Sequence, residues 1–368
     1  MDTPTVDELR AIARDQGVDA LGVSAVEVFE RTRRELHERK ADGLHADMQF
    51  TYRNPDRATD PARHLPGARS LVVGAKSYLR DSGEPPDDGP VGSVARYVWE
   101  DHYAQLEVGL RAVADRLAEA GARTRILIDD NALVDREAAY RAGLGWYGKN
   151  ANLLLPHRGS WFVLGSVLTD ALLPAATPLD DGCGGCTRCL SSCPTNAIVQ
   201  PGVIDANRCL AWLVQARGVF PVEHREALGL RIYGCDDCQE VCPPNLRSSR
   251  QPVEISNAAR RPWIPLVELL QCDDEELMSR YGQWYIPDRE PRYLRRNALV
   301  ALANSGATDD ESVRTVVEVM LVSSDDLVRA HAVWAARKLG FEESLLVLSD
   351  LQPTVVSDEL ERDVSFSG

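Results

Sequence analysis

Eight of the nine cysteines in this 368-residue chain lie between residues 183 and 242, and their spacing is the strongest chemical signal in the sequence. They are Cys183, Cys186, Cys189, Cys193, Cys209, Cys235, Cys238 and Cys242. The first four follow C-x2-C-x2-C-x3-C-P, a bacterial spacing for two 4Fe–4S clusters in which the fourth cysteine ligates the other cluster. Crossed ligation groups Cys242 with Cys183, Cys186 and Cys189, and leaves Cys193, Cys209, Cys235 and Cys238 for the second cluster.

Zinc is the main alternative to iron–sulfur clusters, because paired C-x2-C motifs also form tetrahedral thiolate sites for this metal. The third cysteine in each group, the C-x3-C-P endings and the presence of eight candidate ligands favour clusters. Disulfides are disfavoured in a large chain that we expect to be cytoplasmic. Cys272 lies outside the pattern, and we expect a buried or free thiol there.

Cys209 departs from the pattern of a compact two-cluster ferredoxin, because 25 residues separate it from Cys235. The insert carries Trp212 and Arg217 and could form a wall of a site beside the cluster. Clusters pass single electrons, so a two-electron reduction would need a further cofactor.

Asp129 is the best candidate for acid–base chemistry, since it ends a predicted strand and is followed by Asp130. Paired carboxylates can raise one pKa enough to make a proton donor. A helix cap or a solvated turn is the alternative interpretation. Arg136 could contact a ligand phosphate, or could simply pair with Asp135 or Glu137.

The segment G-L-G-W-Y-G at residues 143–148 matches G-x-G-x-x-G, but it follows a predicted helix and contains bulky Trp146 and Tyr147. A nucleotide-binding loop is therefore disfavoured. The pattern favours a tight loop whose backbone approaches a flat ligand. Lys149 and Asn150 close this loop, which places them near the same strand end as Asp129.

Periodicity predicts helices from Thr5 onward and over residues 28–40, 103–120 and 134–142. It predicts strands over residues 18–23, 70–75, 124–128, 152–155 and 161–168, the last two joined as a hairpin. These elements indicate an α+β domain over residues 1–175, with a sheet flanked by helices. A ferredoxin-like module follows over residues 176–250, and a linker with a helical tail over residues 251–368.

The tail contains two similar stretches, residues 292–306 and 326–340, which resemble HEAT-like repeats and are too few to fold alone. The formal net charge of −15 is the wrong sign for a nucleic-acid binder, so a polyanionic partner would need a local basic face. The repeats offer such a face through Arg292, Arg295, Arg296, Arg329, Arg337 and Lys338. The polar, Pro-rich linker expected around residues 248–265 adds Arg247, Arg250, Arg260 and Arg261.

The composition is that of an ordinary globular protein, with 44% hydrophobic and 26% charged residues. The chain has no apolar run of membrane-spanning length, and its amino terminus lacks the pattern of a secretory signal. We therefore expect a cytoplasmic protein without membrane contact, and a monomer as the simplest assembly.

Several of these stretches together resemble the epoxyqueuosine reductases. The resemblance is carried by L-I-D-D-N-A-L-V-D-R-E-A-A-Y-R-A-G-L-G-W-Y-G-K-N (residues 127–150), G-S-W-F-V-L-G (159–165), I-Y-G-C-D-D-C-Q (232–239) and both cysteine motifs. It runs over about residues 5–250, and the tail matches family members with a HEAT-like extension. The resemblance implies an enzyme with cobalamin and two 4Fe–4S clusters, related to reductive dehalogenases. Such enzymes reduce epoxyqueuosine to queuosine at the wobble position of tRNA, with electrons from an external low-potential donor.

The same resemblance assigns roles to individual residues. It makes Asp129 the proton donor. It implies cobalamin contacts at Lys149, Asn150, Arg96, Tyr97, Trp212 and Arg57, to which the residue pattern adds Arg136.

Two other functions fit parts of the sequence. A reductive dehalogenase acting on a small organohalide would be expected to carry an export signal and would have no use for a basic repeat tail. A non-catalytic electron-transfer or scaffold protein would use the ferredoxin module and the repeats without cobalamin.

Overall fold

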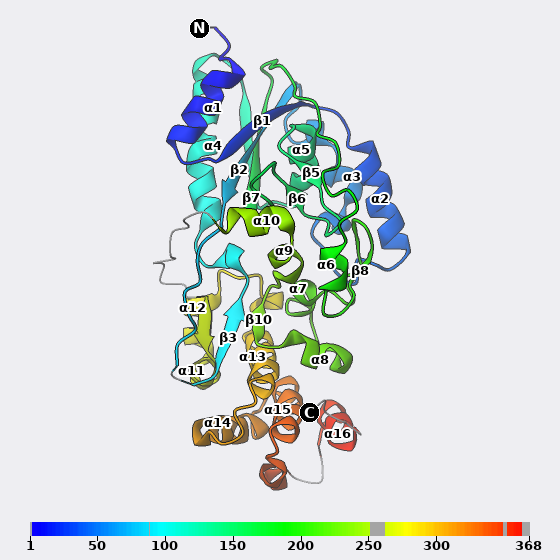
Figure 1. Cartoon of the computed structure of the whole chain (residues 1–368), viewed down its shortest axis with the longest axis vertical. Coiled ribbons are helices and arrows are strands. Elements are labelled where there is room, and N and C mark those ends of the chain that lie inside the picture. The colour runs from blue at the N-terminus through cyan, green and yellow to red at the C-terminus, as the bar shows by residue number, and fades with distance from the viewer. Residues whose placement is uncertain (1, 88, 251–261, 349–351, 363–368) are drawn as a thin grey trace. The chain divides into compact units, whose positions relative to one another are not determined.

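The computed structural model describes residues 2–87, 89–250, 262–348 and 352–362 (Figure 1). The chain forms two compact units, and each is discontinuous in sequence. The first comprises Met1–Asp81, Arg96–Asn207 and Asp236–Ser256, and the second Ser82–Ala95, Arg208–Cys235 and Asn257–Gly368. The region expected to form the ferredoxin-like module is therefore divided, and residues 208–235 belong to the second unit.

The first unit contains a four-stranded antiparallel sheet in the order β1-β2-β7-β4. Its strands are β1 (Ala20–Ala25), β2 (Ser70–Ser77), β7 (Phe162–Thr169) and β4 (Thr124–Ile128). The α+β sheet predicted for the amino-terminal half is present, and β4 has the predicted bounds.

Both faces of this sheet are covered by helices. Successive strand residues point to opposite faces, so Val72 joins one apolar core and Leu71 the other. Helices α1 (Val6–Asp15) and α4 (His102–Glu119) supply the first core, and α5 (Asp135–Arg141) the second. Burial on both sides explains why β2 and β7 are almost wholly apolar.

Helix α4 packs very close to the two central strands. Gly74 of β2 and Gly165 of β7 are register partners at the contact. A Cβ atom at Gly165 would lie 2.9 Å from the side chain of Leu110 on α4. At its start, α4 is capped by Asp101, whose carboxylate accepts the Ala104 amide at 2.9 Å.

The predicted hairpin between residues 152–155 and 161–168 is wrong. The short strand β6 (Leu153–Leu154) pairs with β5 (Trp146–Tyr147), and only Leu155 and Gly159 form an isolated bridge. β7 could not accept β6, because β2 and β4 already occupy its two edges.

Smaller elements complete the first unit. These are α2 (Glu30–Ala41), α3 (Pro55–Ala58), α6 (Arg188–Ser191), β8 (Ile198–Gln200), β9 (Val203–Ile204), α9 (Asp237–Glu240), α10 (Pro243–Ser248) and the 3-10 turns Thr51–Arg53, Pro61–Arg63 and Arg96–Val98.

The second unit contains a three-stranded sheet that the sequence did not predict. Its strands are β10 (Arg231–Tyr233), β3 (Val91–Val94) and β11 (Trp263–Pro265), in that order. β11 lies at the end of the segment that we expected to be a linker, and this strand corrects that expectation. Residues 251–261, including Arg260 and Arg261, lie outside the described residues. Strands of three or four residues from distant parts of the chain carry too little alternation to be recognised.

The rest of the second unit is helical. Its helices are α7 (Leu210–Leu213), α8 (Val222–Leu228), α11 (Leu266–Gln271), α12 (Asp274–Tyr281), α13 (Arg292–Asn304), α14 (Glu311–Leu321), α15 (Asp326–Lys338) and α16 (Thr354–Glu361), with 3-10 turns at Pro287–Arg289 and Glu342–Val347. α13 and α15 occupy the two similar stretches of the tail and pack together. Their assignment to the HEAT-like class stays a prediction. In the described part of the chain, no helix combines the length and apolar character needed to cross a bilayer.

Candidate active site

Asp129 stands directly after β4, where the backbone leaves the sheet. Its φ of 46° lies in the left-handed region, which is uncommon for residues other than glycine and is best tolerated by Asp and Asn. The following turn is closed by Asp130, whose Oδ1 accepts the Ala132 amide at 2.9 Å. A strained backbone of this kind is frequent where a side chain must be aimed at a ligand.

The carboxyl of Asp129 belongs to a cluster of four acidic side chains. Desolvation is the largest cause that raises the pKa of Asp129, although the residue as a whole is exposed, and the charges of Asp101 and Asp130 raise it further. At the first position of α5, burial together with the charges of Asp129 and Asp130 raises the pKa of Asp135 to about 8, against the opposing effect of Arg136. Two carboxyls with raised pKa values therefore lie in and after the turn between β4 and α5, and that of Asp135 can carry a proton near neutral pH.

Asp135 was missed as a functional candidate from the sequence. The segment D-D-N-A-L-V-D contains the signal, because a turn that reverses the chain into α5 brings its last Asp back toward the first. An Asp at a helix start is ordinarily assigned to stabilising the helix, and for that reason Asp135 was not considered as a functional residue.

Arg96 lies beside the second cysteine motif. Its backbone N–H donates to Asp236 Oδ2 at 2.8 Å, and its Nη2 lies 2.8 Å from Glu240 Oε1. The guanidinium stands 5.2 Å and 5.1 Å from the ring centroids of Trp99 and Trp161. Its Nε is buried and has no hydrogen-bond partner within the described residues. Arg96 thus packs on two aromatic rings and keeps one N–H donor that could bind a polar ligand.

The other residues expected at the cofactor are spread more widely. Tyr97 is partly buried against the core of the first unit, while Arg57 on α3 and Arg136 on α5 are exposed. Trp212 is buried on α7 in the second unit. Their cofactor contacts stay predictions.

Lys149 and Asn150 contact the cysteine-bearing loops. Lys149 Nζ donates to the Gly184 carbonyl at 2.6 Å, between Cys183 and Cys186. Asn150 Nδ2 donates to the Cys238 carbonyl at 3.0 Å, and its Oδ1 accepts the Asn152 amide. Within the first unit, these two side chains therefore fix the cysteine loops. Cobalamin contact by them stays a prediction.

The glycine-rich loop before Lys149 approaches protein backbone. A Cβ atom at Gly145 would lie 2.2 Å from the Leu154 carbonyl oxygen. Glycine is required there because β5 and β6 pair across this point. We expected the backbone of this loop to approach a flat ligand. At Gly145 it approaches the backbone of Leu154 instead, which corrects that expectation there.

The thiol of Cys242 lies in the neighbourhood of the first three cysteines. Burial raises the pKa of Cys242 to about 11, and the thiols of Cys183, Cys189 and Cys186 contribute to that rise. Cys183 and Cys186 likewise help to raise the pKa of Cys189. All four residues belong to the first unit, and they are the group expected from crossed ligation.

The other four cysteines are divided between the units. Cys193 and Cys238 belong to the first, and Cys209 and Cys235 to the second. Cys193 Sγ accepts the Ala197 amide at 3.2 Å, a contact typical of cluster thiolates. Among the described residues, none of the nine cysteines forms a disulfide, and Cys272 is buried. Among the described residues, no three His, Cys, Asp or Glu side chains are already arranged to hold a single metal ion.

A buried polar network holds the motif from Cys235 to Cys242 against the sheet. Gln239 Oε1 accepts from Tyr78 Oη at 3.1 Å and from Ser160 Oγ at 2.9 Å. Asn245 Nδ2 donates to Ser160 Oγ and to the Gln239 carbonyl, at 2.9 Å and 2.8 Å. Gln239 and Asn245 were not recognised from the sequence, where they are ordinary polar residues beside cysteines.

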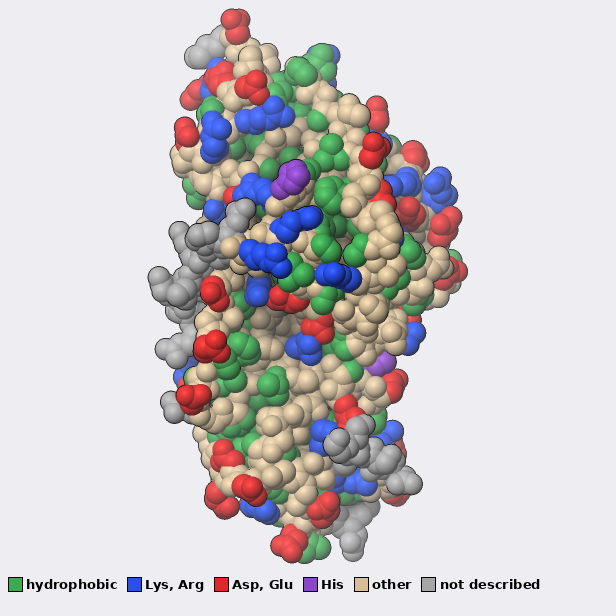
Figure 2. Space-filling model, in the orientation of Figure 1, with side chains coloured by type: hydrophobic (Ala, Val, Ile, Leu, Met, Phe, Trp, Pro, Cys, Tyr) green, Lys and Arg blue, Asp and Glu red, His purple; other side chains and the backbone are tan. Residues whose placement is uncertain are grey.

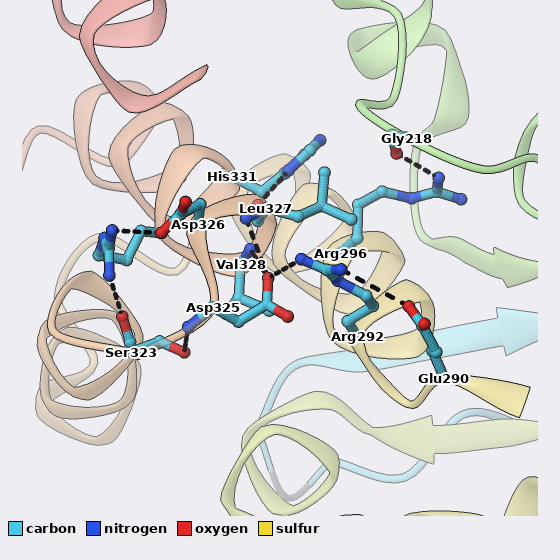
Figure 3. A network of polar contacts seen from close by, with 11 residues as sticks. Gly218, Glu290, Arg292, Arg296, Ser323, Asp325, Asp326, Leu327, Val328 and His331 are labelled. Atoms are coloured by element: carbon cyan, nitrogen blue, oxygen red, sulfur yellow. Dashed lines mark hydrogen bonds and ion pairs between the residues drawn. The ribbon is translucent and has the colours of Figure 1, made fainter. Parts of the chain in front are cut away.

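The basic residues expected to bind tRNA in the tail all have intramolecular partners. Arg292 pairs with Asp325 at 2.8 Å, as Figure 3 shows, and Lys338 pairs with Glu226 at 2.7 Å. Arg295, Arg329 and Arg337 contact Asp274, Asp326 and the Glu359 carbonyl. Arg296 has 0% exposure, so its assignment to tRNA is wrong, because a side chain inside the protein cannot reach phosphates.

A different basic surface surrounds α10 in the first unit. Figure 2 shows Lys and Arg side chains gathered near a histidine over this helix. The surface, here called the α10 patch, consists of exposed His157, Arg158, Arg247 and Arg250. Ser248 Oγ donates to the His157 carbonyl at 3.3 Å, which holds the turn before β7 beside the helix.

Comparison with known proteins agrees with this geometry. A family described as "4Fe-4S double cluster binding domain" matches residues 182–245. The epoxyqueuosine reductase of Bacillus cereus is 32% identical over 90% of this chain and 88% of its own. A solved epoxyqueuosine reductase in complex with an epoxyqueuosine-modified tRNA-Tyr stem loop is 28% identical, with a TM-score of 0.85 over 96% of both chains.

A second curated relative extends the similarity over almost the whole of its length. The epoxyqueuosine reductase of Xanthomonas campestris is 35% identical over 92% of this chain and 97% of its own. Identity of 32–35% over nine tenths of the chain is that of common descent with a shared fold. This chain therefore belongs to the epoxyqueuosine reductase family.

Proposed function

We propose that this chain reduces the epoxide of epoxyqueuosine to the alkene of queuosine at the wobble position of tRNA, with two 4Fe–4S clusters and cobalamin. The observation that carries the proposal is the match to the solved relative with an epoxyqueuosine-modified stem loop, which covers 96% of both chains. Family membership makes the chain an oxidoreductase, and a non-catalytic scaffold no longer fits.

The reaction consumes two electrons and two protons for each epoxide and releases one water. An external low-potential donor would supply the electrons, and the two cysteine sets would pass them on singly. Cobalamin, when bound, supplies a cobalt centre able to deliver both electrons to the epoxide carbons.

The residues of the first unit suit a large polar cofactor beside the clusters. Arg96 has a buried Nε without a partner in the described part of the chain, and it lies over two indole rings. Arg96 and Tyr97 would hold the cofactor, joined by Arg57 and Arg136 through its polar groups. Lys149 and Asn150, which hydrogen-bond to the carbonyls of Gly184 and Cys238, would contribute from their own loop.

Asp129 would hold the proton that allows the epoxide oxygen to leave. Its raised pKa keeps a larger fraction of the carboxyl protonated near neutral pH than an ordinary Asp would have. Asp135, whose own pKa is raised to about 8 by burial and by the charge of Asp129, would carry the second proton. Turnover should fall as pH rises, because both groups then lose their protons.

The test is anaerobic turnover of tRNA that carries epoxyqueuosine, with a chemical reductant and added cobalamin. Asp129→Asn should lower turnover by about 10²–10⁴-fold, the range of general acid catalysis. The cluster and corrin absorption bands should stay unchanged, which would show that both cofactors are still bound. Retained turnover in Asp129→Asn would remove Asp129 from the mechanism, and a wild-type protein that binds no corrinoid would refute the cobalamin proposal.

A further inference from the structure

Arg296 is a fully buried cation on α13 that donates every N–H to an oxygen. Nη1 donates to the Ala216 and Gly218 carbonyls, both at 2.7 Å, the latter drawn in Figure 3. Nη2 donates to the Leu213 carbonyl at 3.1 Å and the Val214 carbonyl at 3.3 Å. Nε and Nη2 also reach Asn297 Oδ1 at 3.0 Å and 2.9 Å. Its contacts in the described residues are thus carbonyls, one amide and the rings of Phe220 and Tyr293.

None of these partners is a carboxylate, which indicates that the guanidinium serves to satisfy backbone carbonyls. A buried arginine held for stability alone is usually paired with an acid, as Arg225 is paired with Glu359 at 2.7 Å in the same unit. Residues 214–221 form no helix or strand, so the carbonyls of this segment that are shielded from water, such as that of buried Val214, need donors from elsewhere. The planar fork of arginine can satisfy four such carbonyls at once, which a lysine cannot.

Two further side chains of the helical tail form hydrogen bonds with the same part of the backbone. Asn297 Nδ2 donates to the Val214 carbonyl at 2.8 Å and to the Ile232 carbonyl at 3.0 Å. His331 on α15 donates from Nδ1 to the Leu327 carbonyl at 2.7 Å, so its Nε2 is the acceptor of the Phe220 amide at 3.1 Å. Arg296, Asn297 and His331 are here called the carbonyl clamp.

The segments gripped by the clamp are those that carry two of the cluster cysteines. Cys209 is the residue before α7, and α7 ends at Leu213, whose carbonyl Arg296 holds. Cys235 follows Ile232 by three positions, and Asn297 holds the Ile232 carbonyl. The amide of Asn297 alone ties the backbone after Cys209 to the backbone before Cys235.

We propose that the carbonyl clamp is a positioning device that sets the spacing of the Cys209 and Cys235 thiolates for their iron–sulfur cluster. The helical tail then supports the electron path as well as any contact with RNA. The proposal rests on the cluster assignment made under the proposed function. Partners behind a metal ligand typically change metal retention by about 10–100-fold when they are removed.

Iron release to a ferrous chelator tests the proposal, with the purified, cluster-loaded full chain under anaerobic conditions. In Asn297→Ser and in Arg296→Lys, half of the iron should be released about tenfold faster, and the other half at the wild-type rate. The midpoint potential of one cluster, followed by electron paramagnetic resonance, should shift while the other stays unchanged.

Asn304→Ser is the matched control, because Asn304 lies on the same helix and also donates to two carbonyls, those of Arg225 and Gly229. It should leave both phases of iron release unchanged. Uniform acceleration of all the iron, an equal effect in Asn304→Ser, or unchanged release in Asn297→Ser would each overturn the proposal. If Arg296→Lys does not fold, Asn297→Ser decides alone. A wild-type chain that holds no clusters would instead refute the proposed function.

Discussion

At the scale of single residues, burial and neighbouring charges raise the pKa of two carboxyl groups, those of Asp129 and Asp135. Asp101, Asp129, Asp130 and Asp135 come from the start of α4 and from the turn between β4 and α5. Burial is the largest cause of the raised pKa of Asp129 and of Asp135, and the charges of neighbouring carboxylates raise both further. A proton donor for epoxide opening needs such an environment, because an ordinary Asp is fully ionised at neutral pH.

Asp135 should make the folded state less stable as pH rises. Its folded pKa of about 8 is above the ordinary value of 3.8, so folding takes up a proton between these pH values. Its favourable contribution is therefore complete below about pH 4 and is lost as pH rises through 8, with a slope of up to about 1.4 kcal/mol per pH unit for one proton.

Asp135→Asn removes this titration. The melting temperature of the variant relative to wild type should therefore increase progressively from pH 4 to pH 8, as thermal unfolding at several pH values would show. The charge-neutral substitution serves as its own control at pH 4, where wild type and variant should agree closely. A difference in melting temperature that does not vary with pH would mean that Asp135 is ionised in the folded protein.

At the scale of elements, periodicity could predict the parts that are buried on a regular face. The apolar runs of β2, β4 and β7 and the spacing of Leu106, Leu110 and Val113 on α4 were enough to foresee the main sheet and its flanking helices. The sheet of β10, β3 and β11 could not be foreseen, because each strand is too short to show a period. Arg296 was wrongly expected on the surface, because an arginine in an amphipathic helix is ordinarily assigned to the face exposed to solvent.

The candidate site shows the same division. The cysteines and Asp129 could be proposed from spacing and from a strand end, which are local signals. Gln239, Asn245 and Asn297 could not, because their roles depend on which backbone carbonyls the fold brings within reach. A polar side chain without a motif carries no local sign of such a partner.

Gly165→Ala should test the close contact between α4 and the sheet. The added Cβ would press on Leu110 at 2.9 Å and on Ile128 at 2.8 Å. Overpacking of this kind should destabilise the protein by about 1–3 kcal/mol, measured by denaturant unfolding. Ser166→Ala is the control on the same strand, because the Ser166 hydroxyl is buried without a partner in the described residues and its loss should be nearly neutral. Equal stability of the two variants would contradict the packing argument.

At the scale of the whole molecule, a formal net charge of −15 must be reconciled with a tRNA substrate. Long-range attraction to a polyanion is weak for such a chain, so binding must depend on local basic surfaces. The tail arginines expected to bind tRNA are engaged within the protein, as Arg292 is with Asp325. Arg247 and Arg250 in the α10 patch are exposed, and α10 directly follows Cys242, a proposed cluster ligand. RNA bound there would lie close to the electron path.

The double variant Arg247→Gln with Arg250→Gln should therefore weaken tRNA binding and flatten its dependence on salt. Each lost phosphate contact removes about 0.7–0.9 from the slope of log K against log salt, so two should lower the slope by roughly 1.4–1.8. Affinity measured by filter binding at several salt concentrations gives both quantities.

The contrasting double variant is Arg292→Gln with Arg329→Gln, in which both guanidiniums already pair with carboxylates, those of Asp325 and Asp326. Because those carboxylates neutralise the two guanidiniums before RNA arrives, few counterions would be released on binding there, and the slope should change less. The reverse order of effects would return RNA contact to the helical tail and leave the α10 patch without a part in binding.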